Sequence, residues 1–218
     1  MGIIEKIVKV TDFPLNTYYQ EEFNKTTIVL HHTVSSGSAD GVISWWKQDG
    51  VHVGVCIVID INGIPYQCFS SKYWAYSLGL KNKYLQSLGL PLDTGEKLER
   101  AVIGIELCNW GWLHKTDNGF INAYNKPVNV PIVEYPNKFK GEQFYQAYSL
   151  AQLETVRELL IYWNQKYNIP LNYNSDMWDV NVDALRGKPG VWTHVSFRPD
   201  KSDCHPQKEL IEMLQSLI

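Results

Sequence analysis

The sequence predicts a single domain that combines strands and helices. Short runs of β-branched and aliphatic residues, typical of buried strands, are interspersed with segments whose apolar residues recur at helical spacing. The chain has 218 residues, of which 44% are hydrophobic, and this is enough material for one ordinary domain with a proper core. The chain shows neither an internal repeat nor a linker, so we expect residues 1–218 to form one domain.

The first half of the chain predicts a strand, a helix and a hairpin, in that order. Residues 26–30 (TTIVL) form a β-branched run that ends at two histidines, and residues 39–48 follow with a capping residue and an apolar helical face. Residues 51–59 and 64–69 are strand-like runs on either side of an Asn-Gly pair. This pair supplies the positive φ of a tight turn, so we expect a β-hairpin.

A further strand and a long irregular segment are predicted near the middle of the chain. Residues 100–108 (RAVIGIELC) are mostly apolar and are interrupted by one carboxylate, Glu106. Residues 109–143 are rich in Gly, Pro, Asn and aromatic residues, and they show no sustained period. We therefore expect this segment to be a surface excursion that borders a groove.

The last third predicts two helices. Residues 149–166 carry apolar residues at helical spacing, with Ser149 as the capping residue and a stop at Asn168 to Pro170. Residues 171–190 are expected to form a loop. Residues 206–218 have the pattern of a short amphipathic helix that closes the chain.

The composition excludes some classes of function and favours another. With 20 Lys and Arg against 23 Asp and Glu, the net charge is −3, so we expect no nucleic-acid partner and no anionic membrane surface as a partner. Eight Trp, 13 Tyr and 7 Phe favour a carbohydrate-bearing substrate, because exposed aromatic rings stack on sugars.

Two further expectations concern cysteines and targeting. The cysteines lie mostly in apolar runs without the spacing of a disulfide framework, so we expect buried, reduced thiols at Cys56, Cys68, Cys108 and Cys204. No apolar run approaches the ~18 residues that a membrane span needs, and residues 1–12 alternate charged and aliphatic side chains. We therefore expect no membrane insertion and no signal peptide.

Three features carry candidate chemistry: His31-His32 at a strand end, Glu106 in an apolar strand, and the run THVSFRPDKSDCHP near the C-terminus. Alone, each has a simpler explanation: a polar pair at a strand end, a half-buried acid beside a basic residue, or a basic loop. A catalytic zinc takes three protein ligands from His, Cys and carboxylate and keeps a fourth position for water. These candidates lie far apart in sequence, which fits an open catalytic site and not a zinc finger.

At these residues the chain resembles the zinc amidases that include phage endolysins, bacterial amidases of muropeptide recycling, and peptidoglycan recognition proteins. The resemblance covers about residues 26–214. Five landmarks occur in the family's order, namely IVLHHT, VIDINGIPYQ, WAYSLG, IGIELCNWG and THVSFRPDKSD.

The resemblance implies one Zn²⁺ per chain, bound by His31, His194 and a third ligand. The family places a lysine two residues before an Asp or Cys ligand, and Lys201-Ser202-Asp203 has this spacing. Asp203 is therefore the predicted third ligand, with Cys204 as its rival. His32 is expected to point to the other side of the strand.

The resemblance also implies catalytic roles for two residues. Glu106 matches the acid of the family's Ile-Gly-Ile-Glu motif, which would take a proton from the attacking water and pass it to the departing amine. Lys201 would stabilise the oxyanion that forms at the amide carbon.

Substrate contacts are expected from Trp74, Tyr76 and His52. The chain departs from the family at two places: Ser77 follows Tyr76 where many relatives have a histidine, and Val55-Cys56 stands where relatives often have Tyr-His. His52 lies nearby and could compensate in part.

The implied fold is α/β, with a central mixed sheet of about five or six strands flanked by helices and the zinc in a surface groove. The implied reaction is hydrolysis of the amide between N-acetylmuramic acid and L-alanine in bacterial peptidoglycan or muropeptides. The implied setting is a phage or prophage endolysin without a separate wall-binding domain, cytoplasmic until it is released to act at the cell wall. The alternatives are a peptidoglycan recognition protein that binds without catalysis, and a protein that inhibits another enzyme.

Overall fold

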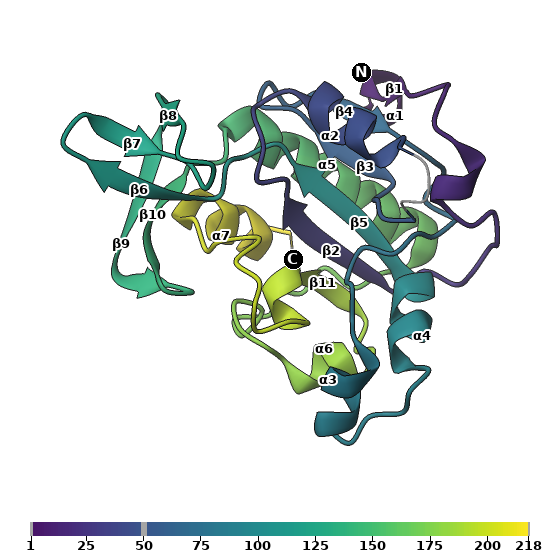
Figure 1. Cartoon of the computed structure of the whole chain (residues 1–218). Helices are drawn as coiled ribbons and strands as arrows, with labels where there is room; N and C mark the ends of the chain where they lie inside the picture. Colours follow the sequence, from purple (N-terminus) through teal and green to yellow (C-terminus); the bar gives the residue numbers. More distant parts are fainter. Residues whose placement is uncertain (1, 49–51, 218) are drawn as a thin grey trace.

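A six-stranded mixed sheet runs through the centre of the protein (Figure 1), in a computed structural model that describes residues 2–48 and 52–217. In spatial order its strands are β1 (Val8–Lys9), β4 (Pro65–Gln67), β3 (Ile57–Ile59), β5 (Val102–Leu107), β2 (Thr27–His32) and β11 (Gly190–Thr193). Strands β3, β5, β2 and β11 are parallel, whereas β4 is antiparallel to β3. The predicted α/β fold with a mixed sheet is therefore confirmed.

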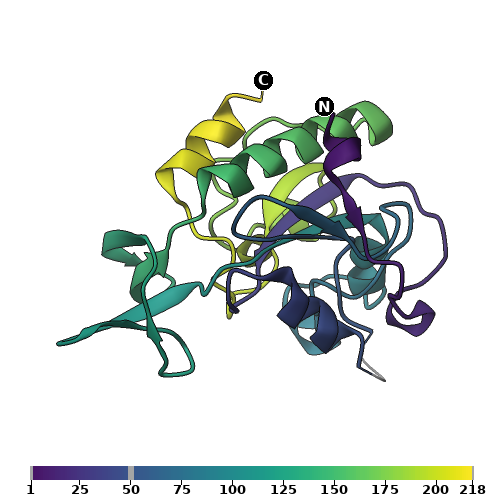
Figure 2. The same ribbon diagram turned by 90° about the horizontal axis from the view of Figure 1, so that it is seen from above.

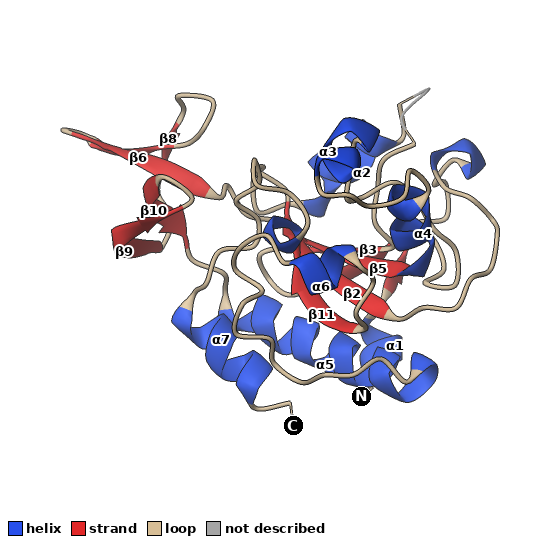
Figure 3. Cartoon of the chain, turned by 90° about the horizontal axis from the view of Figure 1, so that it is seen from below, coloured by secondary structure: helices blue, strands red, loops and turns tan. Residues whose placement is uncertain are grey.

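Helices cover both faces of this sheet (Figures 2 and 3). One layer contains α5 (Leu150–Tyr167), α7 (Lys208–Gln215) and the short α1 (Ile3–Lys6). The opposite side carries α2 (Ala39–Trp46) and α3 (Asn82–Ser87), while α4 (Thr94–Ala101) leads directly into β5. The remaining short helices are α6 (Val182–Leu185) and the 3₁₀ turns η1 (Leu15–Thr17) and η2 (His194–Ser196).

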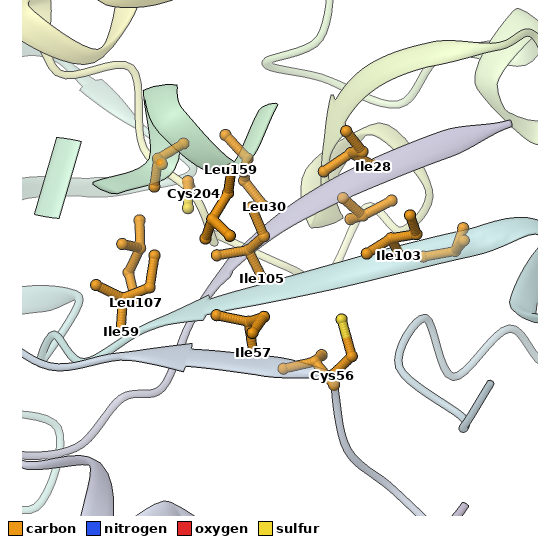
Figure 4. Packing of buried hydrophobic residues seen from close by; sticks show 14 of the residues in the cluster. Ile28, Leu30, Cys56, Ile57, Ile59, Ile103, Ile105, Leu107, Leu159 and Cys204 are labelled. Atoms are coloured by element: carbon orange, nitrogen blue, oxygen red, sulfur yellow. The ribbon is translucent and has the colours of Figure 1, made fainter. Parts of the chain in front are cut away.

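The core lies between the sheet and α5. The register pairs Leu30 with Ile105 and Ile105 with Ile57, so these side chains share one face and pack against Leu159 of α5 (Figure 4). All four are at most 1% exposed. Apolar burial of this extent is the main stabilising contribution to the fold.

Helix α5 forms as the sequence predicts. The Ser149 hydroxyl accepts the Gln152 N–H at 3.1 Å and the Gln152 side chain accepts the Ser149 N–H at 3.1 Å, which is a capping box. The helix ends at Asn168, whose left-handed conformation (φ 58°) satisfies the last turn.

Most of the other predicted elements are present but shorter. The predicted helix at 39–48 ends at Trp46, the predicted C-terminal helix spans Lys208–Gln215, and the loop at 171–190 contains α6. The hairpin is confirmed by the antiparallel pairing of β3 with β4, and Gly63 in its turn has φ 80°. Met1, Val51 and Ile218, which fall in predicted segments, lie outside the described residues.

The prediction of an irregular excursion at residues 109–143 is wrong. This segment forms a second, five-stranded antiparallel sheet that stands out from the main body (Figures 1 and 2). Its strands are β6 (Trp112–Thr116), β7 (Gly119–Ile121), β8 (Pro127–Val128), β9 (Ile132–Phe139) and β10 (Glu142–Gln146). Most of their residues are exposed or half-buried, so they lack the alternation of a half-buried strand.

The four cysteines are buried and free, as predicted. Burial raises the pKa of the Cys56 thiol to about 12 and raises those of the other three thiols too. Among the described residues, no helix is long and apolar enough to cross a membrane.

Replacing Leu159 by Ala should lower the free energy of unfolding by about 2–5 kcal/mol, because the side chain is fully buried and its removal leaves a cavity. Leu150 of the same helix is 73% exposed, so Leu150→Ala is the matched control and should change stability by less than about 0.5 kcal/mol. Urea unfolding measures both. Equal losses in the two variants would contradict the described packing of α5.

Candidate metal centre and active site

Two histidines and one aspartate meet at the carboxyl-terminal edge of the parallel strands. His31 Nδ1 lies 3.0 Å from His194 Nδ1, and Asp203 Oδ2 lies 2.9 Å from His194 Nδ1 and 3.3 Å from His31 Nδ1. The three residues are 3–8% exposed. Among the described residues they are the one group of His, Cys, Asp or Glu side chains arranged to hold a metal ion.

The parallel pairing of β2 with β11 brings the two histidines together. Thr193 pairs with Leu30, so His194 follows the end of β11 beside His31 on β2. The loop after η2 then returns, and the Val195 N–H donates to the carbonyl of Asp203 at 3.1 Å. Residues that are 163 positions apart in sequence thus share one site.

The hydrogen bonding of His194 fixes which nitrogen faces the other two residues. His194 Nε2 lies 3.0 Å from the Leu78 carbonyl oxygen, which can only accept, so Nε2 carries a proton. In a neutral imidazole, Nδ1 then presents a lone pair to Asp203 Oδ2 and His31 Nδ1. Two acceptors at 2.9 Å repel each other unless a proton or a cation lies between them.

The electrostatics of these residues also fit a metal site. Burial, with the charge of His194, lowers the pKa of His31 to about 4. Burial alone would raise the pKa of Asp203, but His194 and His31 outweigh it and hold that pKa well below its ordinary value. A neutral imidazole and an ionised carboxylate are the protonation states that bind a metal. Two imidazoles and one carboxylate form a ligand set that catalytic zinc uses.

Cys204 and His32, the neighbours of two cluster residues, point elsewhere. The Cys204 side chain is fully buried among Leu30 and Leu159 (Figure 4). His32 Nδ1 lies 2.9 Å from the Tyr148 hydroxyl, on the opposite face of β2 from His31, as strand alternation predicts. The structure thus brings Asp203, and not its rival Cys204, to the two histidines.

Glu106 lies on the same face of the sheet as His31. The register of β2 and β5 pairs these two residues directly, and in parallel strands paired residues point to the same side. Burial, and then the negative charge of Asp203, raise the pKa of Glu106 well above its ordinary value, while the charge of Lys201 lowers it. A carboxyl group with a raised pKa is suited to exchange protons near neutral pH.

Lys201 is partly exposed and faces a pocket between the second sheet and the loop that carries Asp203. Its positive charge acts on both Glu106 and His31, lowering the pKa of each. The other residues that line the pocket are Trp112, Lys140, Glu142, Pro199, Asp200 and Ser202.

The three predicted substrate contacts, Trp74, Tyr76 and His52, gather around Tyr19. The Tyr19 and Trp74 rings are stacked with centroids 4.0 Å apart. The ring centroids of His52 and Tyr76 lie 5.8 and 5.9 Å from that of Tyr19. Trp74 is only 3% exposed, whereas Tyr76 is 36% exposed. Within this group, Tyr76 and His52 are exposed to a ligand, whereas the buried Trp74 ring packs against Tyr19 and Tyr76.

Sequence reasoning did not identify the residues that orient His194. The Leu78 carbonyl accepts its Nε2–H, and the loop at Leu78 is bound in turn by the buried carboxylate of Glu99. Backbone acceptors leave no mark in a sequence. Glu99 lies in the short helix α4, and an acid in a short helix usually belongs to a solvent-exposed face. The one sequence feature that pointed to burial of Glu99 is its position next to the apolar Leu98.

Comparisons with known proteins agree with this geometry. The model of the family described as N-acetylmuramoyl-L-alanine amidase matches residues 23–206. A search of curated proteins finds no sequence that matches the chain.

Solved structures share the fold at low sequence identity. PlyL is 13% identical, with a TM-score of 0.53 over 97% of each chain. The N-acetylmuramoyl-L-alanine amidase LysC from Clostridium intestinale URNW is 15% identical, with a TM-score of 0.52 over 97% of this chain and 96% of that one. AmiD from E. coli, solved with the substrate anhydro-N-acetylmuramic acid-L-Ala-D-gamma-Glu-L-Lys, is 15% identical, with a TM-score of 0.50 over 89% of this chain and 59% of that one.

The structural likenesses are too distant in sequence to establish more than the fold. The family model, in contrast, spans most of the sequence and includes each of the residues His31, Glu106, His194 and Asp203. The chain therefore belongs to the N-acetylmuramoyl-L-alanine amidase family.

Proposed function

We propose that this protein is a zinc-dependent amidase that cleaves the bond between N-acetylmuramic acid and L-alanine in bacterial peptidoglycan. The observation that carries the proposal is the convergence of His31 Nδ1, His194 Nδ1 and Asp203 Oδ2 within 3.3 Å of one another. A ring nitrogen 2.9 Å from a carboxylate oxygen requires a proton or a cation between them, and we propose that these three residues hold Zn²⁺ there. Once bound, the ion would polarise the scissile carbonyl and acidify water.

The remaining chemistry falls to two side chains. Glu106, on the same face as His31 and with a raised pKa, would take the proton of the attacking water and deliver it to the departing amine of L-alanine. Lys201 would stabilise the negative charge that develops on the carbonyl oxygen, because its positive charge acts on this centre and lowers the pKa of Glu106.

The substrate would extend from this centre along aromatic surface. Tyr76 and His52 on one side, and Trp112 in the pocket beside Lys201, offer rings on which sugar rings of the glycan can stack. The muropeptide in the AmiD complex carries the same lactyl–L-alanine amide and is a suitable soluble test substrate. We propose a lytic, endolysin-type role at the cell wall as the biological setting.

The first test is the zinc content of the purified protein together with release of new N-terminal L-alanine from peptidoglycan, with and without a chelator. We expect one zinc per chain and release that the chelator abolishes and added zinc restores, because the three-residue site is complete within one chain. Muropeptide binding without zinc or release would instead make the protein a recognition module.

Replacing Asp203 by Ala should remove the bound zinc, because it deletes one of three ligands. Cys204→Ala is the matched neighbour and should keep stoichiometric zinc while losing some stability, because its thiol lies in the core. Metal analysis of both variants, with unfolding curves, distinguishes them. If zinc were lost in the Cys204 variant and kept in the Asp203 variant, the assigned ligand would be wrong.

Replacing Glu106 by Gln should lower kcat by about 10²- to 10⁴-fold, the usual contribution of general acid–base catalysis. Zinc content should remain one per chain, because Glu106 is outside the ligand cluster. Glu154→Gln, on the exposed surface of α5, serves as the control and should leave kcat unchanged. Full activity in the Glu106 variant would mean that another group transfers the proton.

A further inference from the structure

Glu99 is a buried carboxylate that binds three consecutive residues of one loop. It is 3% exposed, and it projects from the buried side of α4. One oxygen accepts the Ser77 N–H at 2.8 Å and its hydroxyl at 3.1 Å; the other accepts the N–H groups of Leu78 and Gly79 at 2.9 and 3.0 Å. Burying a carboxylate is costly unless hydrogen bonds compensate, and here four short bonds do so.

One peptide group connects this carboxylate to His194. The amide between Leu78 and Gly79 donates its N–H to Glu99 at 3.0 Å and accepts the Nε2–H of His194 on its carbonyl oxygen, also at 3.0 Å. The nitrogen and oxygen of an amide share one delocalised electron system. Donation to a carboxylate therefore shifts electron density toward the oxygen and makes it a stronger acceptor.

The geometry of the loop keeps this peptide group in place. Gly79 has φ 60°, and a Cβ at this position would lie 2.7 Å from Arg198 Nη1. Arg198 approaches from the side of the metal-site loop and donates to the Gly79 carbonyl at 3.2 Å, while Asp200 holds its guanidinium. Arg198 Nη1 also lies 3.5 Å from the Leu78 carbonyl oxygen. The Leu78–Gly79 amide therefore lies between a carboxylate on one side and His194 and Arg198 on the other.

We propose that Glu99 is a positioning residue of the metal centre, which acts on His194 through the Leu78–Gly79 peptide group. It keeps the Nε2–H tautomer of His194 and increases the electron-donating strength of Nδ1 toward the metal. Many metal-binding histidines donate directly to a carboxylate for this purpose. Here one peptide unit is inserted between the carboxylate and the imidazole. The inference rests on the proposed function, since it requires His194 to bind the metal.

The test compares Glu99→Gln with Glu96→Gln, which lies on the same helix but is half-exposed and pairs with Arg100. In Glu99→Gln, one carboxylate oxygen is replaced by an NH₂ group, which cannot accept, and the remaining oxygen carries no charge. The hydrogen bond from the Gly79 N–H is therefore lost or weakened. Competition with a chelator should show zinc bound about tenfold to a hundredfold more weakly by Glu99→Gln than by wild type. Glu96→Gln should match wild type.

A second readout uses the metal-free protein. Nitrogen-15 NMR of the histidine rings should show Nε2 of His194 protonated in wild type and in Glu96→Gln, and a fraction of rings without this proton in Glu99→Gln. This measurement separates the two proposals. If wild type binds no zinc, the proposed function fails, while the comparison of Nε2 protonation still tests the connection from Glu99 to His194.

Unfolding curves establish that each variant is folded. If Glu99→Gln does not fold, Glu99→Asp replaces it; this variant keeps the charge, shortens the side chain by one methylene, and should give a smaller loss of zinc affinity. A folded Glu99 variant with the zinc affinity and the Nε2 protonation of His194 found in Glu96→Gln would overturn the inference.

Discussion

The parallel pairing of β2 with β5 on one side and β11 on the other is the constraint on which the site depends. It aligns the carboxyl ends of three strands, so that His31, Glu106 and His194 arrive at one edge of the sheet. Open parallel sheets commonly place ligand sites outside this edge. A register shift of one residue in β2 would turn His31 toward the opposite face of the sheet and His32 toward Glu106. The register that packs Leu30 against α5 therefore also places His31, and not His32, in the cluster.

Strand alternation at β2 separates two polar groups that are neighbours in sequence but not in environment. On the His31 side, the carboxylate of Asp203 balances the histidines. The Tyr148 hydroxyl closes the His32 side, with His205 packed on the same ring. Burial keeps the pKa of His32 near 4, so it is a neutral hydrogen-bonding partner within the core. Sequence adjacency is thus a poor guide to which of two histidines can reach a metal.

Much of the fold and of the candidate site could be predicted, because those features leave local marks in the sequence. The strand at TTIVL, the Asn-Gly turn and the cap at Ser149 each follow from the chemistry of a few adjacent residues, and the family's lysine spacing limited the third cluster residue to Asp203 or Cys204. The second sheet could not be predicted, because its strands are largely exposed and have no apolar alternation. Glu99 could not be predicted for another reason. It binds backbone groups of a loop about 20 residues away, and only the tertiary structure brings the carboxylate and this loop together.

The position of Cys204 has a consequence for redox chemistry. Its neighbour Asp203 brings a carboxylate to the cluster, so His31, His194 and Asp203 form a centre without sulfur. The Cys204 thiol is buried beside Leu30, Leu159 and the Tyr148 hydroxyl. Oxidants convert exposed thiolates to sulfenic and higher acids, but imidazole and carboxylate ligands resist this reaction. With all four thiols buried, the described structure presents the same donor atoms in reducing and in oxidising surroundings.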